Sequence, residues 1–184
     1  IWSRLVGSEM CIRDSQYNKQ GKKHGIWKGY HENTQTKRYE GEFNHGTPIG
    51  RFTYYAIEGH VSGIVDFIND SISSAQMFHD NGSIMAEGKF LNQTKSGKWY
   101  IYSRSGYLLN VLHYLLGAQE GTQYSYYPKF DDYEKVKVME QYECTGGLKN
   151  GVWKEFHKLG TVKAQGNYVE AVSYTHLRAH ETRP

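Results

Sequence analysis

Short segments in which aromatic and polar residues alternate recur along the chain, separated by turns rich in glycine and asparagine. In the segment YEGEF at 39–43, Tyr39, Gly41 and Phe43 share one parity and the two glutamates share the other. Alternation with a period of two is typical of β-strands, whose successive side chains point to opposite faces. No stretch of useful length has the 3.6-residue period of a helix. The pattern therefore predicts an all-β protein built from strands and hairpins.

A longer repeat is superimposed on this alternation. A glycine is followed by an aromatic residue two positions later, a second aromatic residue five positions later and another glycine about nine positions later. The repeat starts at Gly25, Gly50, Gly97 and Gly151, and weaker copies start near Ser74 and at Gly121. A fixed period of about 20–50 residues indicates a repeat architecture, so we expect an elongated single-layer sheet of about six consecutive hairpins over residues 16–170.

The glycines and rings of the repeat predict how its core packs. The central glycine of segments such as YEGEF (39–43) and AEGKF (86–90) leaves room for a neighbouring ring to lie over bare backbone. The core is then a ladder of rings, each packed on the repeat before it. The residues that define the repeat are Gly25, Gly41, Gly50, Gly88, Gly97, Gly151, Tyr30, Phe43, Tyr55, Phe90, Tyr102 and Phe156.

Two features of this ladder stay open in the sequence. Trp27 and Tyr30 are an odd number of residues apart, so the repeat either contains a bulge or uses both faces of the strand. Gln76 and Gln123 stand where a tryptophan or phenylalanine is expected, so the third and fifth repeats are degenerate.

The tryptophans Trp27, Trp99 and Trp153 occupy the first aromatic position of three repeats and admit two interpretations. They are candidate rungs of the ladder. They are also candidate anchors for a protein partner, because rigid aromatic side chains often dominate binding energies.

An insertion in the fifth repeat is a second candidate binding surface. Gly121 and Gly151 are 30 residues apart, and the extra residues lie near 129–137. Insertions in repeats map to loops on one face, often the binding face, although a tolerated surface loop also explains the length. Asp131 and Asp132 are therefore candidate partner-binding residues.

The two ends of the chain are related to each other as DNA. Residues 4–15 (RLVGSEMCIRDS) can be back-translated, reverse-complemented and read again as residues 171–182 (AVSYTHLRAHET). Protein physics does not produce this relation, whereas a linker ligated to both ends of a DNA fragment does, and both segments resemble translated sequencing-adapter sequence. We therefore expect residues 1–15 and 171–184 to be artefactual and exclude them from fold reasoning.

The remaining chain is close to electrical neutrality. Removing four of the 22 Lys and Arg residues and three of the 19 Asp and Glu residues leaves a net charge of about +2. This balance gives no nucleic-acid footprint. Cys144 is then the only cysteine, so the redox compartment cannot be read. Because the native N-terminus is expected to be missing, the localisation stays open between the cytoplasm and export.

Candidate chemistry is sparse. His31, His79 and His157 recur with the repeat, and a ladder spaces equivalent positions about 10 Å apart, which is too far for ligands that converge on one ion. Cys144 occupies the slot of Phe43 and is expected to be a small buried hydrophobe. No phosphate-binding loop, dinucleotide fingerprint or nucleophile elbow occurs. We therefore expect no enzymatic activity, no cofactor and no metal.

The segment 39–43, followed by Gly46, Gly50, Phe52 and Gly59, resembles a MORN repeat. The spelling GKWYIY at 97–102 is closer to the MORN-variant repeats of bacteria, one group of which is antitoxin-like. The resemblance covers residues 22–170. It implies an elongated, twisted single sheet of consecutive hairpins and carries no catalytic residues to transfer.

The resemblance leaves three functions open. The favoured one is a non-catalytic scaffold that binds another protein. The second is an antitoxin or immunity-type protein that neutralises a toxin. The third is a peripheral membrane organiser, for which the basic cluster of Lys19, Lys22, Lys23 and His24 is weak support.

Overall fold

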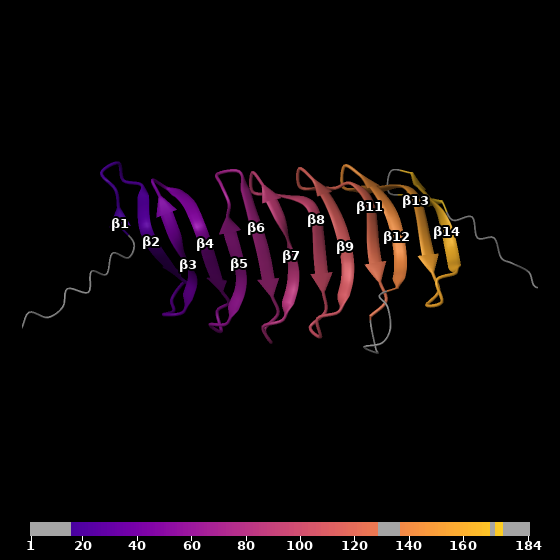
Figure 1. Ribbon diagram of the computed structural model, residues 1–184, viewed down its shortest axis with the longest axis horizontal. Helices are drawn as coiled ribbons and strands as arrows, with labels where there is room; N and C mark the ends of the chain where they lie inside the picture. Colours follow the sequence, from indigo (N-terminus) through magenta and orange to yellow (C-terminus); the bar gives the residue numbers. More distant parts are fainter. Residues whose placement is uncertain (1–15, 129–136, 170–171, 175–184) are drawn as a thin grey trace, which may run out of the picture.

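The protein is an open, elongated β-sheet (Figure 1). The computed structural model describes residues 16–128, 137–169 and 172–174. All regular structure in these ranges is β-strand, and the strands form one 15-stranded sheet whose paired neighbours run antiparallel. The strands follow one another across the sheet in chain order, except that the short β10 pairs only with β9. The predicted all-β fold of consecutive hairpins in a single layer is confirmed.

Six hairpins carry the repeat, and we number them repeats 1 to 6. They are β2 (Lys23–Tyr30) with β3 (Lys37–Asn44), β4 (Thr47–Tyr55) with β5 (Val61–Phe67), β6 (Ile72–Phe78) with β7 (Ile84–Leu91), β8 (Thr94–Tyr102) with β9 (Leu108–Leu115), β11 (Gly121–Tyr126) with β12 (Val138–Thr145), and β13 (Leu148–Phe156) with β14 (Val162–Val169). We call the first strand of each hairpin its leading strand and the second its trailing strand. Loops within repeats line one long edge of the sheet, and turns between repeats line the other (Figure 1).

Three short strands complete the sheet: β1 (Gln16–Tyr17), β10 (Ala118–Gln119) and β15 (Val172–Tyr174). β1 pairs with β2 and continues the ladder before repeat 1. β15 pairs with β14 and lies inside the range 171–184 that the sequence marks as artefactual. The origin of both terminal segments stays a prediction.

The register aligns the repeats by a single rule. Each starting position of a leading strand lies opposite the last core residue of the trailing strand in the same repeat. The pairs are Gly25 with Phe43, Gly50 with Phe67, Ser73 with Phe90, Gly97 with Tyr114, Gly121 with Cys144 and Gly151 with Tyr168. Cys144 therefore occupies the predicted ring slot, where it is buried at 2% exposure.

Repeat 3 departs from the expected alignment by one residue. Ser73, rather than Ser74, takes the starting position, so Ala75 takes the ring slot and the expectation for Gln76 is wrong. The reason is local backbone geometry. Gly50 and Gly97 adopt positive φ of 61° and 68°, which a serine rarely does, and β6 accordingly pairs with β5 without the register shift seen before repeats 2, 4 and 6.

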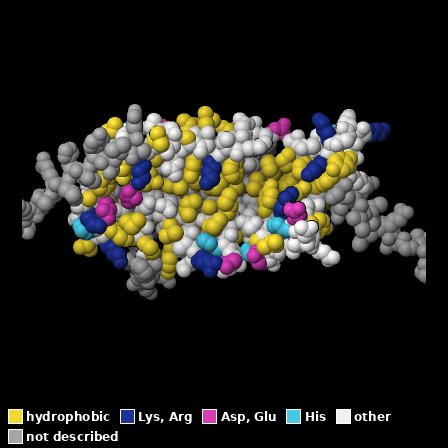
Figure 2. Space-filling model, turned by 180° about the vertical axis from the view of Figure 1, so that it is seen from behind, with side chains coloured by type: hydrophobic (Ala, Val, Ile, Leu, Met, Phe, Trp, Pro, Cys, Tyr) yellow, Lys and Arg dark blue, Asp and Glu magenta, His cyan; other side chains and the backbone are white. Residues whose placement is uncertain are grey.

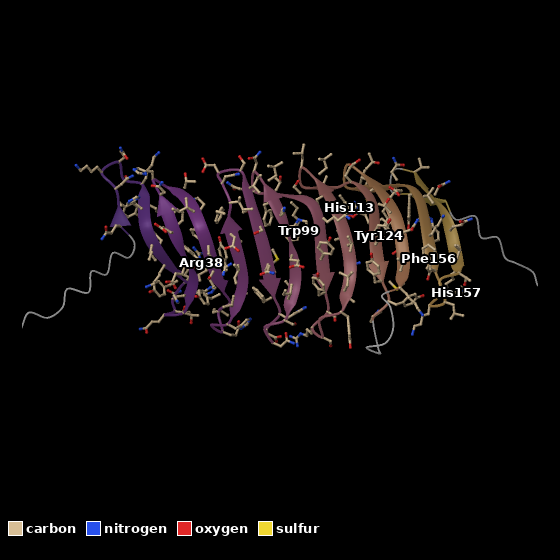
Figure 3. All side chains as sticks on the ribbon, in the orientation of Figure 1. Arg38, Trp99, His113, Tyr124, Phe156 and His157 are labelled. Atoms are coloured by element: carbon tan, nitrogen blue, oxygen red, sulfur yellow. The ribbon has the colours of Figure 1, made fainter. Side chains whose placement is uncertain are left out.

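The two faces of the sheet differ in composition. The core face carries the ladder: Trp27, Phe52, Ser73, Ala75, Ala86, Trp99, Gln123 and Cys144 are its buried side chains in the described leading and trailing strands. The open face carries a row that crosses the sheet from partner to partner: Lys28, Glu40, Thr53, Ile64, Gln76, Glu87, Tyr100, Val111, Tyr124, Gln141 and Lys154. Side chains project from both faces along the whole sheet (Figure 3).

The odd spacing of Trp27 and Tyr30 is explained both by a bulge and by the use of both faces of the strand. The pairing of β2 with β3 shifts between Gly29 and Tyr30, and the same shift precedes the second aromatic position in each of the six repeats, including Phe78 in repeat 3. The repeat also uses both faces. Trp99 lies over Gly88 on the core face, whereas Tyr102 donates a hydrogen bond to Glu87 on the open face.

Candidate binding surface

Two of the three candidate tryptophans are core rungs. The ring of Trp99 lies over Gly88, where an added Cβ would come 2.4 Å from the ring, and Trp99 is 0% exposed. Its indole N–H donates to the carbonyl oxygen of Lys89 at 3.1 Å. Trp27 is 9% exposed, and its indole N–H donates to the carbonyl oxygen of Gln16 at 3.1 Å. Neither ring presents the broad accessible surface that a partner anchor needs.

Trp153 occupies the same sequence position but is only half-buried. It pairs with Tyr142, which stands where repeats 1 and 3 have Gly41 and Gly88. A side chain at this position prevents the ring from lying flat on the backbone of the preceding strand. The indole N–H of Trp153 is buried and has no acceptor among the described residues. Trp153 is therefore a less complete rung than Trp99.

Lysines cover the rings of the core face at three repeats, a feature that the sequence analysis missed. The distances from Nζ to the ring centroid are 4.7 Å for Lys23 and Trp27, 4.6 Å for Lys95 and Trp99, and 4.0 Å for Lys149 and Tyr142. The view from behind shows hydrophobic side chains in a band along the sheet with basic side chains among them (Figure 2). Such cation–π contacts contribute about 0.5–2 kcal/mol each. The shared spelling Lys-x-Gly-x-Trp was the signal that could have found them.

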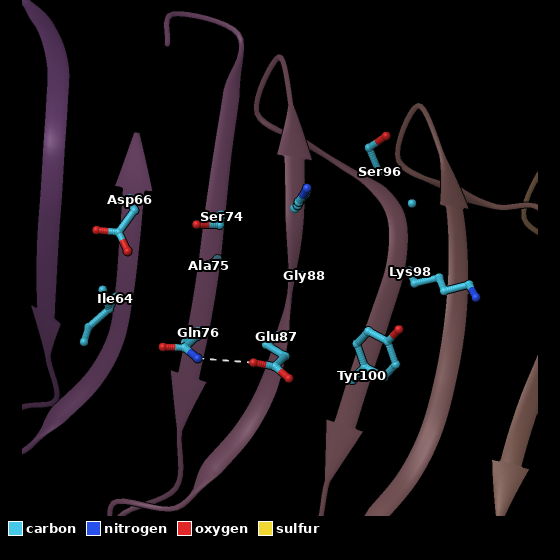
Figure 4. A pocket seen from close by; sticks show the side chains of 12 residues that line it. Ile64, Asp66, Ser74, Ala75, Gln76, Glu87, Gly88, Ser96, Lys98 and Tyr100 are labelled. Carbon is cyan, nitrogen blue, oxygen red and sulfur yellow. Dashed lines mark hydrogen bonds between the residues drawn. The ribbon is translucent and has the colours of Figure 1, made fainter. Parts of the chain in front are cut away.

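The open face contains a groove over β5 to β8 with a volume of about 650 Å³ (Figure 4). It is hollow because the residues beneath it are small: Ser74, Gly88, Ser96 and Gly97 contribute little volume. Its walls are longer side chains, among them Ile64, Gln76, Glu87 and Tyr100. A volume of this size falls within the range of ligand pockets.

The acidic side chains in the groove are held by partners. Asp66 accepts two hydrogen bonds from Arg51, at 2.8 Å from Nε and 3.0 Å from Nη2. The guanidinium of Arg51 lowers the pKa of the Asp66 carboxyl. Glu87 accepts from Gln76 Nε2 at 3.2 Å and from the Tyr102 hydroxyl at 2.8 Å. Both carboxylates are therefore fixed in place.

Tyrosines continue the open face beyond the groove. Tyr124 and Tyr126 stack with their ring centroids 6.4 Å apart, and both are half-buried. Tyr124 and Tyr100 are both cross-strand partners of Val111, which is 7% exposed. Burial, together with the neighbouring tyrosines, raises the pKa of Tyr126. The result is an aromatic surface of half-exposed rings next to a polar groove.

The recurring histidines join successive repeats. His31 Nε2 lies 2.9 Å from the carbonyl oxygen of Tyr55, and His79 Nε2 lies 3.1 Å from that of Tyr102. Each contact links one repeat to the next at the edge that carries the within-repeat loops. Within residues 16–128, 137–169 and 172–174, no group of three or more His, Cys, Asp and Glu side chains could hold a metal ion.

Two further candidates have simple placements. Burial raises the pKa of the Cys144 thiol, and its sulfur lies 3.6 Å from Gln119 Oε1. A raised pKa disfavours the thiolate, which is the nucleophilic form of cysteine. Asp131 and Asp132 lie outside the described residues, so their role stays a prediction.

The comparisons with known proteins point to the class that the fold defines. Residues 149–170 match the family model of the MORN repeat variant, and this segment contains most of repeat 6. The match supports a MORN repeat protein. MORN repeats are associated with protein or membrane interactions and have a generally non-catalytic β-fold. A search of curated proteins gave no match.

Proposed function

We propose that this chain is a non-catalytic scaffold that binds another protein through the open face of its sheet. The observation that carries the proposal is a group of half-buried tyrosines on the open face. On the core face, Trp27 and Trp99 are used in the ladder, at 9% and 0% exposure, although Trp153 is half-buried. On the open face, Tyr100, Tyr124 and Tyr126 are only half-buried, and Tyr100 lines the groove. Half-exposed, rigid tyrosines next to polar side chains are typical of protein-binding surfaces.

The antitoxin function is one form of this proposal. A toxin encoded by a neighbouring gene would be the first partner to test, because neutralisation requires only stable binding. The same open face would then cover the toxin, with the tyrosines as its central contacts.

The proposal is tested with one identified partner and two matched variants. A partner captured from the source organism, or the product of the neighbouring gene, is purified, and its affinity for the chain is measured by calorimetry. We expect the double variant Tyr100→Ser/Tyr124→Ser to bind at least about 10-fold more weakly, because hot-spot truncations cost about 2 kcal/mol or more. Leu159→Ser serves as the control, since Leu159 is 89% exposed in a within-repeat loop. Equal affinity for both variants would contradict binding through the open face.

Membrane attachment is a second candidate, and the between-repeat edge favours it. Ile68, Leu115, Leu116 and Leu148 lie at this edge and are 55–71% exposed. Leu116 also has a φ of 50°, a left-handed conformation that is unfavourable for a branched apolar residue. No burial of Leu116 offsets this cost. Exposed apolar residues held at a turn tip would be stabilised by contact with a lipid interface. In the described part of the chain there is no helix with the length and apolar character for a bilayer crossing.

The edge is tested by sedimentation with vesicles of phosphatidylcholine containing phosphatidylglycerol. We expect Leu116→Asn to reduce the bound fraction while leaving the fold intact, because asparagine tolerates positive φ. Tyr124→Ser on the open face is the control. Absence of any sedimentation of the unaltered chain at low salt would exclude this second candidate.

A further inference from the structure

The geometry points to the groove of the open face as a binding site for a carboxylate, carried by an acidic side chain in an extended segment of the partner protein. This inference rests on the proposed function and names the chemistry that the open face recognises. Four polar groups that line the groove carry it: the ammonium groups of Lys89 and Lys98 and the hydroxyl groups of Ser74 and Ser96.

Three of the four groups lie on adjacent strands at one height of the sheet, and Lys98 lies further along β8. Ser74 on β6 pairs with Lys89 on β7, and Lys89 pairs with Ser96 on β8. Lys98 follows two residues after Ser96, beyond the bulge at Gly97. Adjacent strands are about 4.8 Å apart, so Ser74, Lys89 and Ser96 lie close enough to contact one small anion. The side chain of Lys98 extends toward β9 (Figure 4), and its flexible stem must change rotamer to reach the same anion. Their small neighbours leave the space that such an anion needs (Figure 4).

Several charged side chains elsewhere on the open face are held in ion pairs. Lys37 bonds to Glu40 at 2.7 Å, and Arg51 bonds to Asp66 at 2.8 Å. Among the described residues, Lys89 and Lys98 form no ion pair, and both are exposed. The carboxylate of Glu87 is directed to Gln76 and Tyr102 instead. Within the part of the chain that the structure describes, the groove therefore has two positive charges without a counter-ion of their own.

Charge complementarity selects the partner. An anion that enters the groove gains two charge-assisted hydrogen bonds from lysines, and the serine hydroxyls can donate two more. The chain as a whole is close to neutral and has no basic stripe, which disfavours a nucleic-acid backbone as the source of the anion. An extended peptide fits better, because the floor of the groove is a β-sheet face whose side chains alternate at the same spacing as those of a strand. Glu87 and Asp66 would repel a second acid placed deeper in the groove.

The inference is tested on the full chain by two-dimensional NMR with a synthetic probe. The probe is a short capped peptide of alternating glutamate and serine, and the matched peptide has glutamine in place of glutamate. We expect saturable shifts of the amides of Ser74, Lys89, Ser96 and Lys98 with the acidic peptide alone. The double variant Lys89→Glu/Lys98→Glu should weaken this binding at least about 10-fold, because charge reversal replaces attraction by repulsion.

The control variant is Lys154→Glu, which changes the same charge on the same face, four strands away from β8. Equal weakening by Lys154→Glu would overturn the inference, because the effect would then come from the overall charge. Shifts that also occur with the glutamine peptide, or that spread over all lysines, would overturn it as well. Binding by phosphate ions but not by the acidic peptide would assign the groove to a free anion.

The proposed function can fail separately. If an identified partner requires Tyr100 and Tyr124 but tolerates Lys89→Glu/Lys98→Glu, then the open face binds protein and only the carboxylate site is wrong. If the acidic peptide binds the groove but no partner requires the tyrosines, then the groove is a site and the scaffold proposal is wrong.

Discussion

Repeats 4 and 6 begin with the same spelling, yet their tryptophans end in different environments. Trp99 is fully buried, and its indole N–H bonds to a backbone carbonyl at 3.1 Å. Trp153 is half-buried, and its indole N–H has no acceptor among the described residues. The difference lies in the strand before each ring, which presents Gly88 in one case and Tyr142 in the other. A rung is therefore made by two successive repeats, and the motif of one repeat does not define it.

The largest expected effect is the loss of a complete rung. We expect Trp99→Ala to lower the free energy of unfolding by about 3–5 kcal/mol, the usual cost of removing a buried tryptophan. Trp153→Ala should cost about 1–2 kcal/mol, because a half-buried ring removes less apolar surface from water. Urea denaturation followed by circular dichroism measures both.

A third tryptophan separates burial from position in the array. Trp27 and Trp153 lie near opposite ends of the described sheet. Unlike Trp153, Trp27 is only 9% exposed, and its indole N–H is hydrogen-bonded. Trp27→Ala should therefore resemble Trp99→Ala. If it resembles Trp153→Ala instead, distance from the centre decides the cost and the rung comparison fails.

The second largest loss of stability is expected when a methyl group is added beneath the ring of Trp99. An added Cβ at Gly88 would lie 2.4 Å from the ring of Trp99, so Gly88→Ala must displace the ring, at a cost of about 1–3 kcal/mol. Gly63→Ala is the matched control in another trailing strand, where the nearest atom is the carbonyl oxygen of Gln76 at 3.4 Å. The control should be neutral or slightly stabilising, since alanine restricts the unfolded chain. Thermal unfolding of both variants compares them, and equal shifts in Tm would refute a special role for Gly88.

Much of this comparison could be predicted from the sequence. The glycine-to-aromatic spacing located the repeat, and the central glycines of YEGEF and AEGKF indicated that rings lie over bare backbone, as Phe52 does over Gly41. The odd spacing of Trp27 and Tyr30 left two alternatives, a bulge in the strand or the use of both of its faces, and both occur. These features follow from local spacing, which a single sequence contains.

The features that escaped prediction depend on how one repeat meets the next. The position of Ala75 could not be read because Ser73 replaces a glycine and removes a bulge, which moves the register by one residue. Gln123, in contrast, does occupy a ring slot at 0% exposure, because its side chain bonds to the backbone of His113. The groove arises from small residues on several strands, and no single segment carries that pattern.

The comparison can be sharpened by giving repeat 6 the glycine that it lacks. In Tyr142→Gly, the ring of Trp153 can lie over the backbone of β12, and we expect its indole N–H to bond to the carbonyl oxygen of Glu143, as Trp99 bonds to Lys89. Removing the Tyr142 side chain lowers the stability, whereas packing the Trp153 ring on the backbone and bonding its N–H raise it. The net change in the free energy of unfolding should therefore be within about 1 kcal/mol. The indole resonance of Trp153 is the decisive measurement. It should move toward that of Trp99, and an unchanged resonance would show that something other than Tyr142 holds the ring away.

The smallest expected effect concerns the second aromatic position, which is Tyr102 in repeat 4 and Phe156 in repeat 6. Burial, followed by the hydrogen bond to Glu87, raises the pKa of Tyr102 from 10.0 to about 12. Between these values the folded state keeps a proton that the unfolded state has lost, so this contribution is complete below pH 10 and is lost as the pH rises to about 12. The stability difference between the unaltered chain and Tyr102→Phe should shrink across that window. Other tyrosines titrate in both proteins and cancel in the difference.

Repeat 6 supplies the control for this pH dependence. Phe156 has no hydroxyl, and the trailing strand before it presents Gln141 where repeat 3 presents Glu87. Phe156→Tyr should therefore add a tyrosine without a carboxylate to accept its hydrogen bond, and its stability should depend less on pH between 10 and 12 than that of the Tyr102 site. Denaturation midpoints at a series of pH values compare the two. An equal dependence at both sites would mean that burial alone raises these pKa values and that the Glu87 carboxylate contributes nothing.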